Sequence, residues 1–100
     1  MAQNVRDKFG NQIYITDERW EHIHKRHPET IGHEKQIVKT IRSGDRSQLP
    51  LEPEVFKYKK SFDNLPEPHS QIVVIVKFGH KINQHRKARQ NNFVITAFMK

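Results

Sequence analysis

The sequence contains no cysteine, which excludes disulfide bonds and thiolate metal sites. Hydrophobic residues make up only 34% of its 100 residues, enough for one domain with one modest core. The longest apolar run, Ile72 to Val76, is too short to cross a bilayer, and the N-terminal stretch MAQNVRDKFG lacks the apolar centre of a signal peptide. These absences favour a cytoplasmic protein without a membrane partner.

Acidic residues are also scarce in the second half of the chain. The formal net charge is +7. Residues 1–50 carry nine Lys and Arg against seven Asp and Glu, whereas residues 51–100 carry nine against four. A basic balance of this size favours a polyanionic partner, either a nucleic acid or an anionic surface.

The stretch from Ile13 to Glu29, IYITDERWEHIHKRHPE, predicts a short strand followed by a helix. Thr16 is a suitable N-cap, and the acidic residues that follow it suit the positive end of a helix dipole. Pro28 disfavours the helical conformation at His27, so the helix is expected to end there. At about 100° per residue, Trp20 and Ile23 form its buried face.

Three histidines in this stretch have different expected positions. His24 and His27 lie near the packed face, and His22 points away from it. The spacing H-x-H-x-x-H lacks a carboxylate or cysteine that would complete a metal site, so we expect no metal here. Packing beside Trp20 is the expected role of His24.

The rest of the chain predicts a single α+β domain over residues 1–100. We expect two N-terminal helices packed on a three- to four-stranded antiparallel sheet. The expected elements are a loose lead-in (1–11), a strand (12–15), a second helix ending at Gly44 (32–43), a loop (44–53), strands at 55–60, 71–78 and 93–99, and a basic connection (80–92).

Two groups of basic residues are candidates for phosphate contacts. The segment Lys77 to Arg89 has five Lys and Arg and no acid, which is typical either of a loop that holds a nucleic-acid backbone or of a solvated hairpin loop. Lys57 and Lys59 share one face of a strand, and form either a basic surface or edge lysines that prevent aggregation. Thr96 lies in an apolar strand, where threonine usually fills space.

The motif W-x-H-I-x-x-x-H-P-E at Trp20 to Glu29, the strands VFKYKK and QIVVIVK, and the closing ITAF at Ile95 to Phe98 occur in an order that resembles a known family. Over residues 12–100 the chain resembles the phage-type members of the barnase–EndoU–colicin–RelE superfamily of RNases. The resemblance implies a RelE-like fold of two helices on a small antiparallel sheet. It also implies a metal-independent endoribonuclease that needs no cofactor, toxin-like or of phage or mobile-element origin.

In such an enzyme a base takes the proton of a ribose 2′-OH, which attacks the adjacent phosphorus, and an acid protonates the 5′-oxygen. The resemblance places His22 and His27 as acid and base, without deciding which is which. If both residues were helical, they would point about 140° apart, so His27 must leave the helix to share a site with His22.

The remaining candidates have two roles. Catalytic roles are implied for Lys59, at the scissile phosphate, and for Thr96, as a donor to a phosphate oxygen or a group that orients a neighbour. Substrate binding is implied for Lys57 and Lys77 and, outside the matched motifs, is expected for Arg86 and Arg89.

Three functions therefore stay open. The first is an endoribonuclease acting on RNA, with tRNA or rRNA the expected substrates. The second is a non-catalytic RNA- or DNA-binding module on the same fold. The third is a member of a toxin–antitoxin pair whose basic face binds an acidic inhibitor or antitoxin protein.

Overall fold

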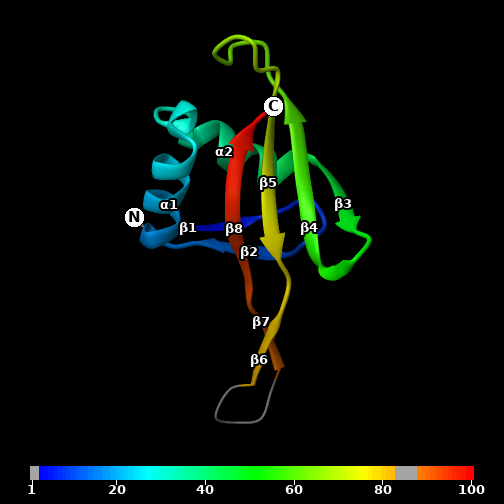
Figure 1. Ribbon diagram of the computed structural model, residues 1–100. Helices are drawn as coiled ribbons and strands as arrows, with labels where there is room; N and C mark the ends of the chain where they lie inside the picture. The colour runs from blue at the N-terminus through cyan, green and yellow to red at the C-terminus, as the bar shows by residue number, and fades with distance from the viewer. Residues whose placement is uncertain (1–2, 83–87) are drawn as a thin grey trace.

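The computed structural model describes residues 3–82 and 88–100 and shows an α+β fold (Figure 1). The elements in chain order are β1 (Gln3–Arg6), β2 (Gln12–Ile15), α1 (Asp17–Arg26), the 3-10 turn η1 (Pro28–Thr30), α2 (Glu34–Ser43), β3 (Asp45–Leu49), β4 (Glu52–Ser61), β5 (Gln71–Lys77), β6 (His80–Ile82), β7 (Ala88–Gln90) and β8 (Asn92–Met99).

The described residues form one six-stranded mixed sheet, in the order β1-β2-β8-β5-β4-β3. The neighbours β8, β5, β4 and β3 are antiparallel, as are β1 and β2, but β2 runs parallel to β8. The prediction of a three- to four-stranded antiparallel sheet was therefore wrong in the number of strands and in the β2–β8 pairing, whereas the antiparallel order of β4, β5 and β8 agrees with it. The parallel pairing joins residues 79 positions apart, Ile13 to Asn92 and Tyr14 to Phe93, and such a distant pairing leaves no local pattern.

Two segments expected to be irregular are strands. Residues 3–6 of the expected loose lead-in form β1, which buries Val5 beneath the sheet. Within the expected loop 44–53, Asp45–Leu49 form the edge strand β3. This edge strand is almost entirely polar and carries no apolar alternation, which is why its pattern resembled a loop.

The helix α1 begins where its sequence predicted. The hydroxyl oxygen of Thr16 accepts a hydrogen bond from the Arg19 N–H at 3.2 Å. The helix ends at Arg26, and His27 takes a non-helical conformation (φ −132°, ψ 72°) before Pro28 starts the 3-10 turn.

The helix α2 starts at Glu34, two residues later than expected, because Gly32 makes a turn with φ +87°. It ends at Gly44, as predicted, but Gly44 has an extended conformation rather than a left-handed one. A Cβ atom at Gly44 would overlap the backbone oxygens of Thr40 and Lys59. Glycine is therefore required because the end of α2 passes directly against β4.

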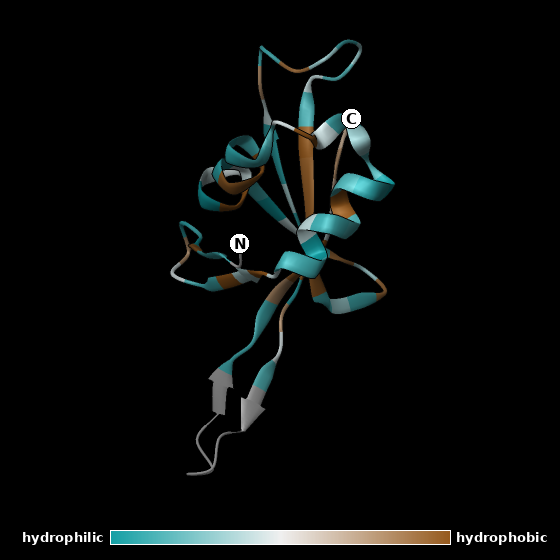
Figure 2. Ribbon diagram, turned by 90° about the vertical axis from the view of Figure 1, so that its left-hand side faces the viewer, coloured by the Kyte–Doolittle hydropathy of each residue, from teal (hydrophilic) through white to brown (hydrophobic). Residues whose placement is uncertain are grey.

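One face of the sheet carries the core. The helix α2 packs against β5, β4 and β1 behind the sheet as drawn in Figure 1, and α1 lies beside β8. Figure 2 shows hydrophobic residues in the central strands and on the helix surfaces turned toward them, with hydrophilic residues outside. Fully buried side chains include Ile23, Ile37, Ile41, Tyr58, Ile72, Val74, Val76 and Val94.

The basic connection at 80–92 is partly regular. The strands β6 and β7 pair antiparallel and form an arm that projects beyond β5 and β8 (Figure 1). Arg86 lies outside the described residues, and of Arg89 only the backbone is described, paired with Lys81. Among the described residues, no helix is long and apolar enough to span a membrane.

Candidate active site

A groove between α1 and β8 brings together residues that the sequence analysis singled out separately. It is lined by His22 and Arg26 from α1, by His27 just after the helix, and by Ile95 and Thr96 from β8. His22 and His27 are both partly exposed in this groove. His27 lies outside the helix, so the separation of about 140° between two helical residues does not apply to it. Both histidines can therefore line the same groove.

The backbone around His27 is held by several hydrogen bonds. Its N–H donates to the Ile23 carbonyl oxygen at 2.8 Å, and its own carbonyl oxygen accepts from the Thr30 N–H at 2.9 Å and the Thr30 hydroxyl at 2.7 Å. Thr30 is fully buried. Since these bonds use only backbone atoms of His27, its position does not depend on its imidazole.

The His27 imidazole has two further neighbours. Its Nδ1 lies 3.7 Å from a carboxylate oxygen of Glu29, and its ring centroid lies 5.7 Å from that of Phe98. A carboxylate beside one ring nitrogen orients an imidazole and leaves the other nitrogen for proton transfer. Glu29 therefore lies within ion-pair distance of a protonated His27 imidazole.

A bulge in β8 shapes the opposite wall of the groove. Ile75 of β5 is the partner of Thr96 and Val76 is the partner of Val94, so Ile95 is the extra residue of the bulge. The Ile95 carbonyl oxygen accepts a hydrogen bond from the Arg19 guanidinium at 3.4 Å. This bond ties the bulge to α1, and both Ile95 and Thr96 reach the groove.

Thr96 has an unusual hydroxyl group. Its Oγ1 is buried and has no hydrogen-bond partner among the described residues. Leaving such a group unpaired is costly, typically about 1–3 kcal/mol. A hydroxyl of this kind beside two histidines and an arginine is suited to donate to an anionic ligand.

The sheet face opposite α2 continues from this groove. Strand partners point to the same side of a sheet, and successive residues alternate. Thr96 is the partner of Ile75, which is the partner of Lys57, and Phe98, Val73 and Lys59 form the next row. Because neighbouring strands are about 4.8 Å apart, Lys57 is placed about 10 Å from Thr96 across β5.

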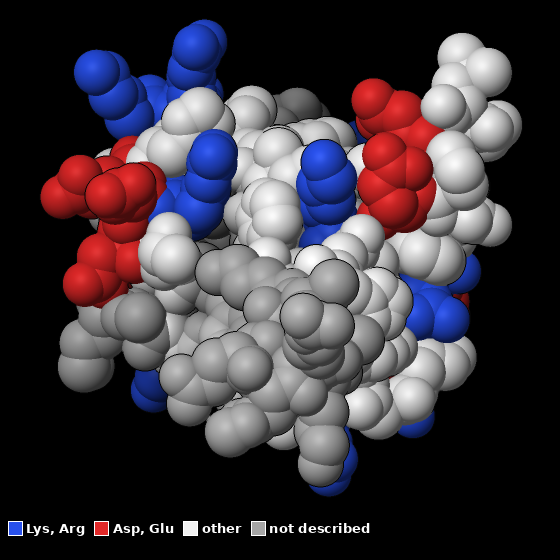
Figure 3. Space-filling model, turned by 90° about the horizontal axis from the view of Figure 1, so that it is seen from below, with Lys and Arg blue, Asp and Glu red and all other residues white. Residues whose placement is uncertain are grey.

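Lys77 lies on the same face, at the partner position of Phe93 in β8 and of Val55 in β4. We call the face that carries Lys57, Lys59, Lys77 and Thr96 the open face. Viewed from the arm end, Lys and Arg atoms lie along the upper rim between two groups of acidic atoms (Figure 3). The lysines of the open face come from two neighbouring strands, Lys57 and Lys59 from β4 and Lys77 from β5.

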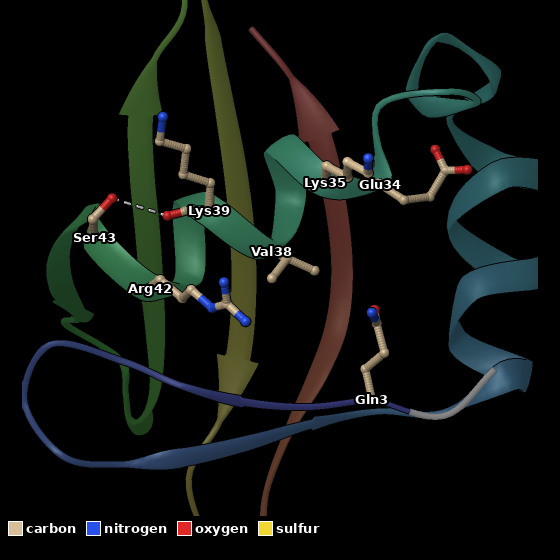
Figure 4. A pocket seen from close by; sticks show the side chains of 7 residues that line it. All are labelled: Gln3, Glu34, Lys35, Val38, Lys39, Arg42 and Ser43. Atoms are coloured by element: carbon tan, nitrogen blue, oxygen red, sulfur yellow. Dashed lines mark hydrogen bonds between the residues drawn. The ribbon is translucent and has the colours of Figure 1, made fainter.

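A second hollow lies on the other side of the sheet, between α2 and β1 (Figure 4). Its lining is basic but contains none of the histidines: Gln3, Glu34, Lys35, Val38, Lys39, Arg42 and Ser43. The Ser43 hydroxyl is already occupied, since it donates to the Lys39 carbonyl oxygen at 3.1 Å. The hollow offers one carboxylate, from Glu34, and three cations, from Lys35, Lys39 and Arg42, but no imidazole.

His24 is separate from the groove. Its ring stacks on Trp20 with centroids 5.8 Å apart, and its Nε2 lies 3.9 Å from a carboxylate oxygen of Glu34. It therefore packs between the two helices, in the position expected from the sequence. No group of three or more His, Asp and Glu side chains in residues 3–82 and 88–100 is arranged to hold a metal ion.

A buried polar cluster ties the β1–β2 turn to β4. The Asp7 carboxylate, fully buried, accepts hydrogen bonds from the Tyr58 hydroxyl at 2.5 Å, the Phe9 N–H at 2.9 Å and the Asn11 N–H at 2.8 Å. Burial alone would raise the pKa of Asp7, but these hydrogen bonds outweigh it and lower the pKa. Burial, followed by the hydrogen bond and charge of Asp7, raises the pKa of Tyr58.

Three residues in and around the groove were given no role from the sequence: Arg26, which lines it, and Glu29 and Arg19, which contact its walls. Arg26 follows His22 by four residues and so shares its helix face, which is the signal that could have found it. Glu29 was read as part of a motif without a role. Arg19 holds the β8 bulge, which no short-range pattern predicts.

No protein-family model matches the chain, and comparisons with curated proteins and with solved structures found no significant match.

If the open face binds RNA, replacing its lysines with glutamine weakens that binding and flattens its salt dependence. Each lost phosphate contact lowers the slope of log K against log salt by about 0.7 for a single strand. The triple variant Lys57→Gln, Lys59→Gln, Lys77→Gln should thus lose about two units of slope, as measured by fluorescence anisotropy. The matched control replaces Lys35 and Lys39 of α2, and an equal loss there would contradict a specific role for the open face.

Proposed function

We propose that this protein is a metal-independent endoribonuclease that cleaves RNA by attack of a ribose 2′-OH on the adjacent phosphorus. The observation that carries the proposal is the groove lined by His22, Arg26, His27 and Thr96, whose hydroxyl has no hydrogen-bond partner in the described part of the chain. The resemblance to the barnase–EndoU–colicin–RelE superfamily supports the same activity, and we propose membership of that superfamily with it.

The two imidazoles supply the two proton transfers that the reaction needs. One takes the proton of the 2′-OH as the new P–O bond forms, and the other gives a proton to the 5′-oxygen as the old P–O bond breaks. Histidine suits both roles because its unperturbed pKa is about 6.5. The products are a 2′,3′-cyclic phosphate and a free 5′-OH.

The remaining groups of the groove stabilise charge. The Arg26 guanidinium offers several N–H donors to phosphate oxygens, and the Thr96 hydroxyl offers one more. Donors fixed in advance around a developing oxyanion are worth about 10²–10³ in rate each. Lys59 and Lys57 extend the positive surface along the bound strand.

The test is incubation of the purified protein with mixed tRNA and rRNA in EDTA, followed by a denaturing gel. Discrete fragments from the wild-type protein, absent with the double variant His22→Ala, His27→Ala, would support the proposal. His69→Ala, in the loop between β4 and β5, is the matched histidine control and should cleave normally. Intact RNA together with a salt-sensitive gel shift would instead favour a non-catalytic binding module.

Replacing Thr96 with valine separates catalysis from stability. Valine has nearly the same shape, and it removes a buried hydroxyl that has no partner in the described structure. We expect kcat to fall by about 10²-fold if the hydroxyl donates to the transition state, while the thermal unfolding midpoint stays equal or rises. A variant with normal kcat would show that the Thr96 hydroxyl takes no part in the reaction.

A further inference from the structure

Two aromatic side chains lie beside the histidine groove without an assigned role. Tyr14 of β2 and Phe93 of β8 are partners in the parallel pairing, so their side chains lie on the same side of the sheet. They line a hollow together with Gln3, Ile15, Thr16 and Asn91. Tyr14 remains 38% exposed despite its size.

Within the described residues, neither Tyr14 nor Phe93 stacks on another ring or lies beneath a cation. By contrast, Phe98 meets the ring of His27, and Phe56 meets the ring of Phe78 at 4.7 Å. Tyr14 is exposed, Phe93 is partly exposed and both line the hollow, so a ligand in the hollow can contact both residues.

Two elements lead from this hollow to the groove. Along β8, Phe93 precedes Thr96 by three residues, a distance of about 10 Å at 3.3 Å per residue. Along α1, Thr16 precedes His22 by six residues, about 9 Å at 1.5 Å per residue. The hollow and the groove are thus neighbouring sites, and the base that adjoins a phosphate in the groove can reach the hollow.

The charge next to the hollow fits a nucleic-acid strand. Lys77 is the strand partner of Phe93 on the open face, and Lys57 lies further along the same face. The lining of the hollow includes Tyr14, Ile15 and Phe93 and contains no acidic residue. An apolar platform beside cations is the arrangement with which proteins bind single strands, because bases stack on the rings and phosphates meet the cations.

We propose that Tyr14 and Phe93 form a subsite that binds one unpaired base next to the scissile phosphate, which makes single-stranded RNA the substrate class. This inference rests on the proposed function, since it places the base relative to the histidine groove. A base that is still paired and stacked in a duplex presents no face to these rings. Duplex RNA is therefore a poor ligand.

The experiment measures binding separately from cleavage. A short fluorescein-labelled oligonucleotide, 2′-O-methylated throughout so that it has no attacking hydroxyl, is titrated with protein and followed by anisotropy. Stacking on an aromatic ring contributes about 1–3 kcal/mol per base, so Tyr14→Leu and Phe93→Leu should each weaken binding by about 5- to 150-fold. Tyr14→Phe should bind as the wild type does, and Leu51→Ala, at an exposed hairpin position, is the matched apolar control.

A set of oligonucleotides with one abasic nucleotide at successive positions identifies the base. At one position the abasic ligand should bind wild type and Phe93→Leu equally weakly, because the stacking partner is already gone. The contrary result is that the two leucine variants lose the same factor of affinity for every abasic ligand, for the duplex and for the intact strand. That result would show that the two rings only stabilise the sheet, and would overturn the subsite. Thermal unfolding of each variant detects such a structural role directly.

Failure of the subsite and failure of the proposed function give different results. If the protein cleaves RNA but Tyr14→Leu and Phe93→Leu keep wild-type binding and KM, the subsite is overturned and the nuclease stands. If the protein cleaves nothing but shows the ring-dependent loss with single strands, the subsite stands and the nuclease is overturned. Absence of any binding to the single strand overturns the subsite.

Discussion

Alanine at His27 is expected to lower kcat for RNA cleavage by about 10²–10⁴-fold, the usual range for loss of a general acid or base. The fold should survive, because the Thr30 hydrogen bonds reach the carbonyl oxygen of residue 27, which alanine keeps. His22→Ala should have a loss of the same size. Single-turnover kinetics at saturating protein measure both.

The pH dependence of these variants separates acid from base. The wild-type profile of kcat against pH should be bell-shaped, with one limb from each histidine. The variant that lacks the base should lose the acidic limb, and the variant that lacks the acid should lose the basic limb. The double variant should have a kcat only slightly lower than that of the worse single variant, since the two groups act as a unit. Near-normal kcat in both single variants would contradict the assignment.

Loss of the Asp7 carboxylate should have the largest effect on stability. Asp7→Ala leaves the Tyr58 hydroxyl and two turn N–H groups without their acceptor, in a site where the carboxylate is fully buried. We expect a loss of about 3–5 kcal/mol in the free energy of unfolding and a fall in Tm of at least about 12 °C. Asp63→Ala, an exposed acid in a loop, is the control and should change little.

The same carboxylate makes stability depend on acid. The pKa of Asp7 is lowered in the folded protein. The carboxylate therefore contributes fully to the free energy of unfolding above the pKa of an aspartate in the unfolded chain, about 3.9. That contribution is lost as the pH falls through the folded value. The wild-type unfolding free energy should therefore fall below about pH 4, and Asp7→Asn should lack this part of the fall. Urea titrations between pH 2 and pH 7 measure the difference.

The parts of the fold that follow short-range rules could be predicted from the sequence. The Thr16 cap and the Pro28 stop fixed α1, and the apolar run from Ile72 to Val76 identified the central strand. The strands β1 and β3 could not be found in this way. Their pairing depends on distant partners, and their sequences QNVR and DRSQL have little apolar alternation.

The candidate site was predictable to a similar extent. His22 and His27 were named as a pair and Thr96 was named apart from them, and all three line one groove. What joins them is the non-helical backbone at His27 and the bulge at Ile95, and a bulge depends on the register between two strands. The Tyr14–Phe93 hollow depends on a parallel pairing of two residue pairs, which the sequence does not reveal.

The most direct test of the central claim is the chemistry of the cut ends. A single-stranded RNA that the protein cleaves in EDTA would be compared with the same strand 2′-O-methylated at the nucleotide that provides the attacking hydroxyl. We predict a 2′,3′-cyclic phosphate and a 5′-OH from the first, and no cleavage at that site of the second. A 5′-phosphate product, or cleavage of the methylated strand, would contradict attack by the 2′-OH and with it the roles of His22 and His27.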